Sequence, residues 1–211
     1  MNKKVIWITG ASSGIGKSLA LKFVKEGWIV AASARREDLL QDLNKENSNI
    51  LLIGKTFGHI EQSCFLKENF SITEGLPPEI NLNNEKNNGE SLLNLIDKDL
   101  VKSAHDVSLG GIITAISKMC IKGNKGIKLM TPKNLINKTE YLFAEDQGRY
   151  IIEINPEDLK EVSKILSKDS VHYEELGVII DNEMIINEKT KVTIDELKSY
   201  NINWLYKYMD S

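Results

Sequence analysis

The sequence has few of the residues that mark secreted, metal-binding or membrane proteins. Its two cysteines, Cys64 and Cys120, lie far apart and have no Cys-x-x-Cys or Cys/His ligand spacing. Such thiols fit a reducing compartment, and we interpret them as buried thiols rather than as a disulfide or metal ligands. No apolar run approaches the roughly 18 residues of a membrane span, and Thr9-Gly10 ends the first run too early for a signal peptide. We therefore expect a cytoplasmic protein without a metal site.

An excess of basic charge is also missing. The 211 residues contain 27 Lys and Arg against 30 Asp and Glu, so the formal net charge is −3. This balance predicts no general attraction to nucleic acid or to anionic membranes. A hydrophobic content of 41% with 27% charged residues is ordinary for a folded globular protein. The length allows either one domain or a small domain joined to a fragment.

A glycine-rich turn lies near the start of the chain. Val5-Ile8 is a short apolar run typical of a buried parallel strand, and apolar residues from Ile15 to Val24 recur at helical spacing. Trp28-Ala32 predicts a second strand, and a further helix is expected to start within Glu37-Leu43. The turn Thr9-Gly16 joins the first strand to the first helix. The pattern therefore predicts a βαβα unit.

This position gives the glycines a chemical meaning. Glycines let the backbone turn sharply and approach a pyrophosphate, which then faces the N–H groups at the helix N-terminus. The alternative is a tight strand–helix turn that binds nothing. The candidate cofactor-binding residues of the turn are Thr9, Gly10, Ser12, Ser13, Gly14, Ile15 and Gly16.

The stretch from Met1 to about Asn49 closely resembles the short-chain dehydrogenase/reductase family, whose members carry TGxxxGxG at this place. In that family an acidic residue at the end of the second strand favours NAD. Here Ala34 fills that position, and Arg35 and Arg36 follow it. Two guanidinium groups suit a 2′-phosphate, so the resemblance implies NADP(H) as cofactor. A solvated loop is the alternative interpretation of the two arginines.

The dehydrogenase resemblance stops before the chemistry. The family's active site needs a Tyr followed four residues later by Lys, with an upstream Ser. None of the six tyrosines has a lysine at that offset, and the family's Asn-Asn-Ala-Gly motif is missing. Without this acid/base pair a hydride transfer has no proton partner. We therefore expect no catalytic residue from this family.

The character of the chain changes at Ile50-Gly54, which predicts a third buried strand. Pro77-Pro78 is interpreted as a loop before a helix that continues through Ser91-Leu100, with Leu92, Leu93, Leu95 and Ile96 on its apolar side. The further expected elements are a strand within Val101-Ala104, a helix opened by Gly110-Gly111, a strand Tyr150-Ile154, a helix opened by Pro156, a strand Val178-Ile180 with a hairpin through Asp181-Asn182 to Met184-Ile186, and a helix Ile194-Met209 packed by Trp204 and Tyr208.

From about Ile50 onward the chain resembles phosphoribosylformylglycinamidine synthase, in the last domain of its synthetase part. The matching stretches are Ile53-Gly54, Gly58-Ser63, Glu74-Pro78, Asn87-Gly89, Ala104-Gly111 and Leu142-Arg149. Glu61 stands where a glycine is usual, and Leu109 where an acidic residue is common. The resemblance implies an α+β domain with a mixed sheet flanked by helices, like the C-terminal domain of AIR synthase.

The same resemblance implies a ligase of purine biosynthesis. The family makes its amidine from formylglycinamide ribonucleotide, glutamine-derived ammonia and ATP with magnesium. Its ATP, magnesium and catalytic histidine positions belong to earlier domains that this chain does not contain. The implied partners are small nucleotide ligands and the missing domains of the parent ligase.

One loop of this second part is a candidate phosphate site. Ser108 is expected to cap a helix that begins at Leu109, which leaves the first-turn amides of the glycine pair open to a phosphate. A purely structural cap that lets the helix pack closely is the alternative. The candidate residues of this substrate or phosphate loop are His105, Asp106, Ser108, Gly110 and Gly111.

A second polar cluster is interpreted as structural. Glu145, Asp146 and Arg149 are expected to form a solvated turn and an ion pair, which contributes little to stability. His59, beside Gly58, is interpreted as a turn residue rather than a ligand.

The sequence thus predicts an α/β chain with a truncated Rossmann-like βαβα unit at residues 1–49 and an α+β domain at residues 50–211. The truncated unit should leave an unpaired strand edge and an exposed apolar face, and Ile50-Ile53 fits either part. Three functions remain: a fragment of the purine ligase, an NADP-dependent oxidoreductase, and a non-catalytic fusion or a product of gene assembly.

Overall fold

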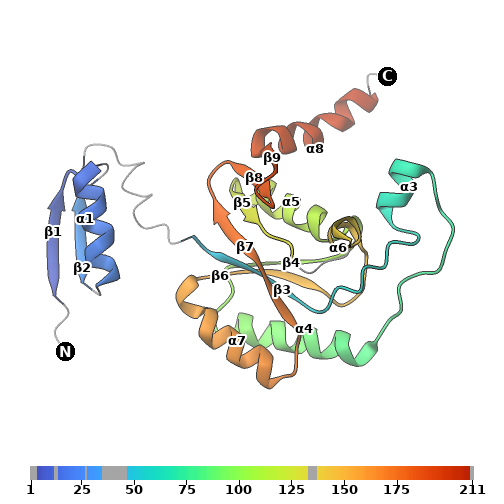
Figure 1. The fold of residues 1–211 in the computed structure, drawn as a ribbon, viewed down its shortest axis with the longest axis horizontal. Coiled ribbons are helices and arrows are strands. Elements are labelled where there is room, and N and C mark those ends of the chain that lie inside the picture. The colour runs from blue at the N-terminus through green and yellow to red at the C-terminus, as the bar shows by residue number, and fades with distance from the viewer. Residues whose placement is uncertain (1–3, 12–13, 27, 35–46, 133–136, 210–211) are drawn as a thin grey trace. The chain divides into compact units, whose positions relative to one another are not determined.

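The computed structural model describes residues 4–11, 14–26, 28–34, 47–132 and 137–209, and only the backbone of residues 25 and 202–208 (Figure 1). The chain divides into two compact units, Met1–Glu46 and Asn47–Ser211. Within the described ranges no helix is long and apolar enough to cross a bilayer. The expected helix within Glu37-Leu43 and the side chains of Trp204 and Tyr208 lie outside the described residues.

The first unit contains two strands and one helix in its described residues. β1 (Val5–Thr9) pairs in parallel with β2 (Ile29–Ser33), and α1 (Gly14–Lys25) connects them. The helix packs on one face of the strand pair, where Ile8, Ala11 and Ala20 are buried. This confirms the predicted strand–helix–strand order.

The opposite face of this strand pair is exposed. Val5, Trp7 and Ile29 are 65%, 73% and 49% exposed, and the two strands form a sheet of their own in the described part of the chain. An isolated pair of strands is rarely stable in water, because both of its edges are unpaired and one apolar face remains exposed to solvent. The predicted unpaired edge and exposed apolar face are therefore confirmed.

The second unit is built on a seven-stranded mixed sheet in the order β4-β6-β3-β7-β5-β8-β9, in which only the β5–β8 pair is parallel. Helices cover both faces, which confirms the predicted mixed sheet flanked by helices. Its elements are β3 (Asn49–Ile53), α3 (Cys64–Phe70), α4 (Leu82–Asp97), β4 (Ser103–Asp106), α5 (Gly111–Gly123), β5 (Gly126–Leu129), α6 (Lys138–Phe143), β6 (Tyr150–Ile154), the 3₁₀ turn η2 (Pro156–Asp158), α7 (Leu159–Lys168), β7 (Tyr173–Ile180), β8 (Glu183–Ile186), β9 (Thr190–Thr193) and α8 (Ile194–Met209).

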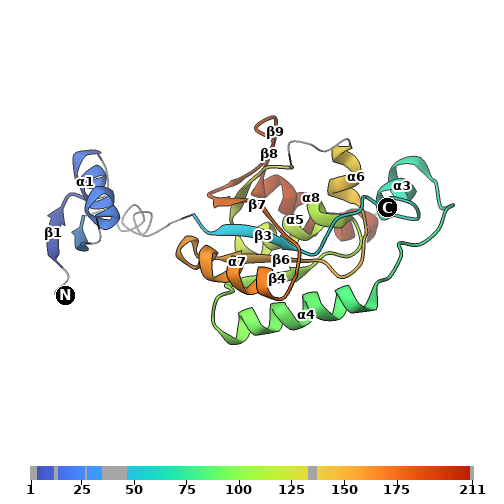
Figure 2. The same cartoon turned by 60° about the horizontal axis from the view of Figure 1, so that its bottom comes forward.

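Strand β3 belongs to this second unit and lies inside its sheet. It pairs antiparallel with both β6 and β7, and Ile50 through Ile53 are at most 2% exposed. Ile50 and Leu52 face a core formed with α5, α6 and α8, whereas Leu51 and Ile53 face a core formed with α4 and α7. Figures 1 and 2 show α5 on one side of the sheet and α4 and α7 on the other. A strand buried on both faces explains why this run is apolar throughout.

The predicted hairpin between Val178-Ile180 and Met184-Ile186 is wrong. β5 lies between β7 and β8, and the hairpin joins β8 to β9 instead. Gly126 permits this insertion: a Cβ at this position would lie 2.1 Å from the carbonyl oxygen of Glu183. The strand order therefore depends on one close backbone contact, which a local pattern does not reveal.

Two smaller expectations are also corrected. Of the four apolar residues expected on the buried side of α4, Leu92 and Leu95 are buried, while Leu93 and Ile96 are 60% and 42% exposed. The helix starts at Leu82, after Asn81 caps it by accepting a hydrogen bond from the Asn84 backbone at 3.0 Å. The strand expected within Val101-Ala104 begins two residues later, at Ser103.

Candidate functional site

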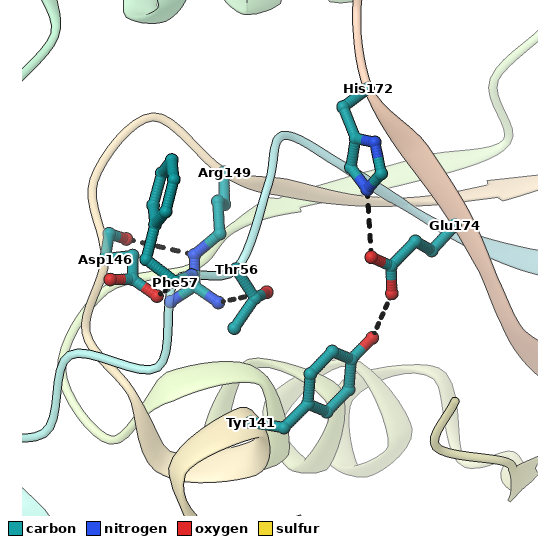
Figure 3. A network of polar contacts seen from close by, with 7 residues as sticks. All are labelled: Thr56, Phe57, Tyr141, Asp146, Arg149, His172 and Glu174. Atoms are coloured by element: carbon teal, nitrogen blue, oxygen red, sulfur yellow. Dashed lines mark hydrogen bonds and ion pairs between the residues drawn. The ribbon is translucent and has the colours of Figure 1, made fainter. Parts of the chain in front are cut away.

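The loop between α6 and β6, residues 144–149, organises the polar interior of the second unit. Asp146 is only 4% exposed, and its carboxylate accepts three backbone N–H groups. Phe57 donates to Oδ2 at 2.9 Å (Figure 3). Gly58 donates to the same oxygen at 3.0 Å, and His59 donates to Oδ1 at 3.3 Å. Burying a carboxylate is costly unless hydrogen bonds stabilise the charge, and these three donors supply them. The expectation of a solvated turn here is wrong.

Arg149 is the most completely buried charged residue of this loop, with 1% exposure. Its Nε donates to the Asp146 carbonyl at 3.0 Å, and its two Nη atoms donate to Thr56 Oγ1 at 3.0 Å and to the Ala144 carbonyl at 2.8 Å. Burial lowers the pKa of Arg149, and the negative charge of Asp146 opposes that shift. A guanidinium stays charged in proteins, so it fixes both ends of the loop and Thr56, which lies in the loop after β3.

A second polar row lies beside this loop. Tyr141 donates its hydroxyl to Glu174 Oε2 at 2.6 Å, and His172 Nε2 lies 2.9 Å from Glu174 Oε1 (Figure 3). Burial, and then the neighbouring Glu174, raise the pKa of Tyr141, so its hydroxyl stays protonated and donates at neutral pH. No local pattern in the sequence identifies Tyr141 and Glu174 as partners, because they lie 33 residues apart.

The predicted cap at Ser108 is wrong. Gly110 is the N-cap of α5 with a left-handed backbone (φ 80°) and no side-chain cap, and the Gly111 N–H donates to the Ser108 carbonyl at 3.0 Å. A Cβ at Gly111 would lie 2.6 Å from the Leu142 carbonyl oxygen. Close packing of α5 on the end of α6 therefore accounts for Gly111, as the structural alternative proposed.

Glu145 occupies the start of this helix. Its Oε1 accepts the Gly110 N–H at 2.8 Å and the Cys64 N–H at 2.7 Å. One carboxylate therefore joins the first residue of α3 to the cap of α5. A negative charge at helix N-termini is stabilising, since the backbone dipoles leave partial positive charge there. Both amides of the glycine pair that were expected to be open are thus bonded to the protein itself, Gly110 to Glu145 and Gly111 to Ser108.

The remaining two candidate residues of the phosphate loop belong to a strand. His105 and Asp106 end β4, with His105 Nδ1 2.6 Å from the Asp106 carbonyl oxygen and 3.4 Å from its Oδ1. His105 lines a cavity beside the C-terminal half of α5 rather than the cap at Gly110. No group of three or more His, Cys, Asp or Glu able to hold a metal occurs among the residues that the structure describes.

The glycine-rich turn of the first unit is close-packed. Thr9 ends β1, Gly10 and Gly14 have φ values of 68° and 56°, and a Cβ at Gly16 would lie 2.4 Å from the Gly10 carbonyl oxygen. Packing of the helix on the turn therefore explains Gly16 without a ligand. Ile15 is 81% exposed, whereas Ser12, Ser13, Arg35 and Arg36 lie outside the described residues.

Two family models match the chain. The model for "AIR synthase related protein, C-terminal domain" matches residues 45–187, and the chain belongs to this family. The model for short chain dehydrogenase matches residues 4–61, so the N-terminal part is similar to a second family. The two matches overlap at residues 45–61, where the pairing of β3 with β6 and β7 places Asn49–Ile53 in the second unit. The chain thus joins pieces that are similar to two different families.

The curated relatives are long proteins of one kind. Phosphoribosylformylglycinamidine synthase subunit PurL of Pelagibacter ubique is 56% identical over 170 residues, which is 81% of this chain and 23% of that protein. The corresponding subunit of Caldanaerobacter subterraneus is 37% identical over 154 residues, 73% of this chain and 21% of that protein. The chain therefore spans less than a quarter of the length of these relatives.

Solved structures share the fold. Thermotoga maritima PurL complexed with FGAR superposes with a TM-score of 0.62 at 16% identity, over 93% of this chain and 39% of that chain. The structure of PurLQS from the same organism gives a TM-score of 0.53 at 20% identity, over 72% of this chain and 26% of that one. At these identities the similarity concerns the fold.

Proposed function

We propose that the second unit serves as the C-terminal part of a phosphoribosylformylglycinamidine synthase, the ligase that forms an amidine with ATP in purine biosynthesis. The observation that carries this proposal is the 56% identity over 170 residues with one PurL subunit. A match over 81% of the chain necessarily spans Asp146 and Arg149, which fix the loops of this fold.

The proposed role is structural and depends on partners. The 144–149 loop fixes the chain after β3 through Asp146 and the starts of α3 and α5 through Glu145. Such a scaffold holds its loops in place for other domains, which contain the binding sites for ATP and magnesium and the catalytic groups. We expect the chain alone to be inactive, because it spans less than a quarter of its relatives. Ser108, Gly110 and Gly111 are the proposed phosphate-facing loop.

A second candidate function concerns the first unit. The match to short chain dehydrogenase at residues 4–61 favours an NADP(H)-binding segment with Thr9–Gly16 at the phosphates and Arg35 and Arg36 at the 2′-phosphate. Oxidoreductase activity is disfavoured, since no tyrosine is followed at four residues by lysine. We propose at most weak cofactor binding, because the described residues of this unit form only two strands of a dinucleotide-binding sheet.

Association with the missing domains tests the proposed role. The full chain is mixed with the Pelagibacter ubique relative from which the matching segment has been deleted, and sedimentation velocity detects a complex. The positive control is the relative's own excised segment. We expect one complex with either addition, and a Trp7→Ser variant of this chain should associate equally well, because Trp7 lies in the first unit. If the excised segment associates and this chain sediments separately, the proposal fails.

A further inference from the structure

A cavity of about 630 Å³ lies in the second unit, between the C-terminal half of α5 and the sheet. Its apolar lining comes from both: Met119 from α5, and Ile50, Ile127 and Ile179 from three strands. Small-molecule sites are usually concave, mostly apolar and of roughly 300–1,000 Å³. The cavity has the size and lining of such a site.

Its polar lining is mainly basic. Lys118 and Lys122, one turn apart on α5, are exposed and make no ion pair with any described residue, while Lys125 is 3.6 Å from Asp181 Oδ1. This concentration of lysines is unexpected, since acidic side chains outnumber basic ones in residues 47–211. The cavity therefore offers positive charge beside an apolar floor.

Opposing charges are few. Glu153 lines the cavity and accepts a hydrogen bond from Ser103 at 2.9 Å. The C-terminal end of α5 adds about half a negative charge, less than either lysine contributes. Cys120 forms part of the wall, and burial raises the pKa of its thiol to about 12, so it adds no anion at neutral pH. Lys118 and Lys122 thus outweigh the negative groups.

The cavity lies away from the N-terminal end of α5, where Glu145 accepts the N–H of Gly110. Gly110 lies at the start of α5 and Lys122 in its last turn. At a rise of 1.5 Å per residue this 13-residue helix is roughly 18 Å long. A ligand in the cavity would therefore leave the hydrogen bond between Glu145 and Gly110 undisturbed.

We infer that this cavity binds a small amphipathic anion, with its apolar body over Met119, Ile127 and Ile179 and its anionic head at Lys118 and Lys122. Neither the apolar lining nor the lysine pair suffices alone. An exposed ion pair contributes only about 0.2–1 kcal/mol, so most of the affinity comes from apolar area removed from water. The lysines select an anion over a neutral or cationic molecule of the same shape.

The test uses the full chain labelled with ¹³C at its methionine methyl groups and titrated with decanoate below its micellar concentration. We expect the Met119 signal to shift and saturate, while the signals of Met130 and Met209 stay in place. Decyltrimethylammonium has the same chain with a cationic head, so it should shift the Met119 signal only at clearly higher concentrations than decanoate does. An unmoved Met119 signal with decanoate, or an equal response to the cation, overturns the inference.

Matched lysine pairs locate the head group. Lys118→Gln with Lys122→Gln removes the proposed contacts, whereas Lys160→Gln with Lys164→Gln removes an exposed pair of the same spacing on α7. We expect the first double variant to raise the Kd of decanoate about fivefold and the second to leave it unchanged. Folding is checked by the positions of the other methionine signals. Equal affinities in both double variants would contradict the assignment of the lysines.

Discussion

Glu145 Oε1 lies 2.8 Å from the backbone nitrogen of Gly110, at the start of α5. The same oxygen accepts the N–H of Cys64, the first residue of α3. A carboxylate of the chain thus lies where the sequence suggests a phosphate. Glu145 thus supplies a hydrogen-bond acceptor at the N-terminal end of α5, where the N-cap residue Gly110 has no side chain to do so. The charge of Glu145 also limits how strongly an anion can bind there.

Removing the charge of Glu145 should strengthen anion binding at this helix. Glu145→Gln keeps an acceptor oxygen for Gly110 and Cys64 but removes the repulsion toward a phosphate. We expect the Kd of inorganic phosphate, followed by the amide shift of Gly110, to fall severalfold. Glu157→Gln removes an exposed carboxylate of η2 and serves as control. Unchanged phosphate affinity in the Glu145 variant would argue against a phosphate-facing loop.

Arg149 should be indispensable to the second unit. Arg149→Met leaves the carbonyls of Ala144 and Asp146 and the hydroxyl of Thr56 without their donor, and Arg149→Lys cannot reach all three. We expect the free energy of unfolding to fall by about 3 kcal/mol for the methionine variant, measured by urea titration with far-UV circular dichroism. The exposed Lys160→Met should change it little. If Arg149→Met lowers the free energy of unfolding no more than Lys160→Met does, other contacts hold the 144–149 loop in place.

Local patterns predict the described elements of the first unit and several elements of the second, but not α3, β5, α6 or β9. β1, α1 and β2 follow from short apolar runs and from glycines at Gly10 and Gly16, all within a few residues of one another. The terminal helix Ile194–Met209 was predicted at both ends for the same reason. Whether these segments form a helix or a strand depends on residues close to them in the sequence, so it can be predicted from the sequence.

The environment of the polar cluster depends on distant residues. Asp146 was predicted to be solvated, yet its three donors come from a loop almost ninety residues earlier. The strand Gly126–Leu129 is four residues long and inserts between β7 and β8 through a backbone contact at Gly126. Neither partner can be recognised from a charge motif or a short apolar run, because both result from tertiary pairing.

High pH should remove a stabilising contribution of Cys120. Burial raises the pKa of this thiol from 9.0 to about 12. The contribution is complete below pH 9, where the thiol is neutral in both states, and it declines as pH rises from 9 toward 12 and only the unfolded state ionises. The stability advantage over Cys120→Ala should therefore shrink by about 1.4 kcal/mol between pH 8 and pH 10. Urea unfolding under reducing conditions measures this, and a constant difference would contradict the buried, neutral thiol.

The first unit should bind NADP(H) only weakly. Its sheet has two described strands, and a dinucleotide normally lies across a crevice that needs more of them. Fluorescence titration with NADPH should give a dissociation constant well above the micromolar range. Gly16→Ala should abolish even that binding, since its Cβ would lie 2.4 Å from the Gly10 carbonyl oxygen. A submicromolar constant would show that the unit is completed in a way these strands do not reveal.

The central claim is that the chain contributes a structural part to an amidine-forming ligase and has no turnover of its own. Its most direct test is ATP-dependent conversion of formylglycinamide ribonucleotide, with ammonia as the nitrogen source. The assay compares this chain, the Pelagibacter ubique relative without its matching segment, and their mixture. We predict product only in the mixture, at a rate approaching that restored by the relative's own segment. Turnover by the chain alone, or an inactive mixture when the relative's own segment restores activity, would contradict the claim.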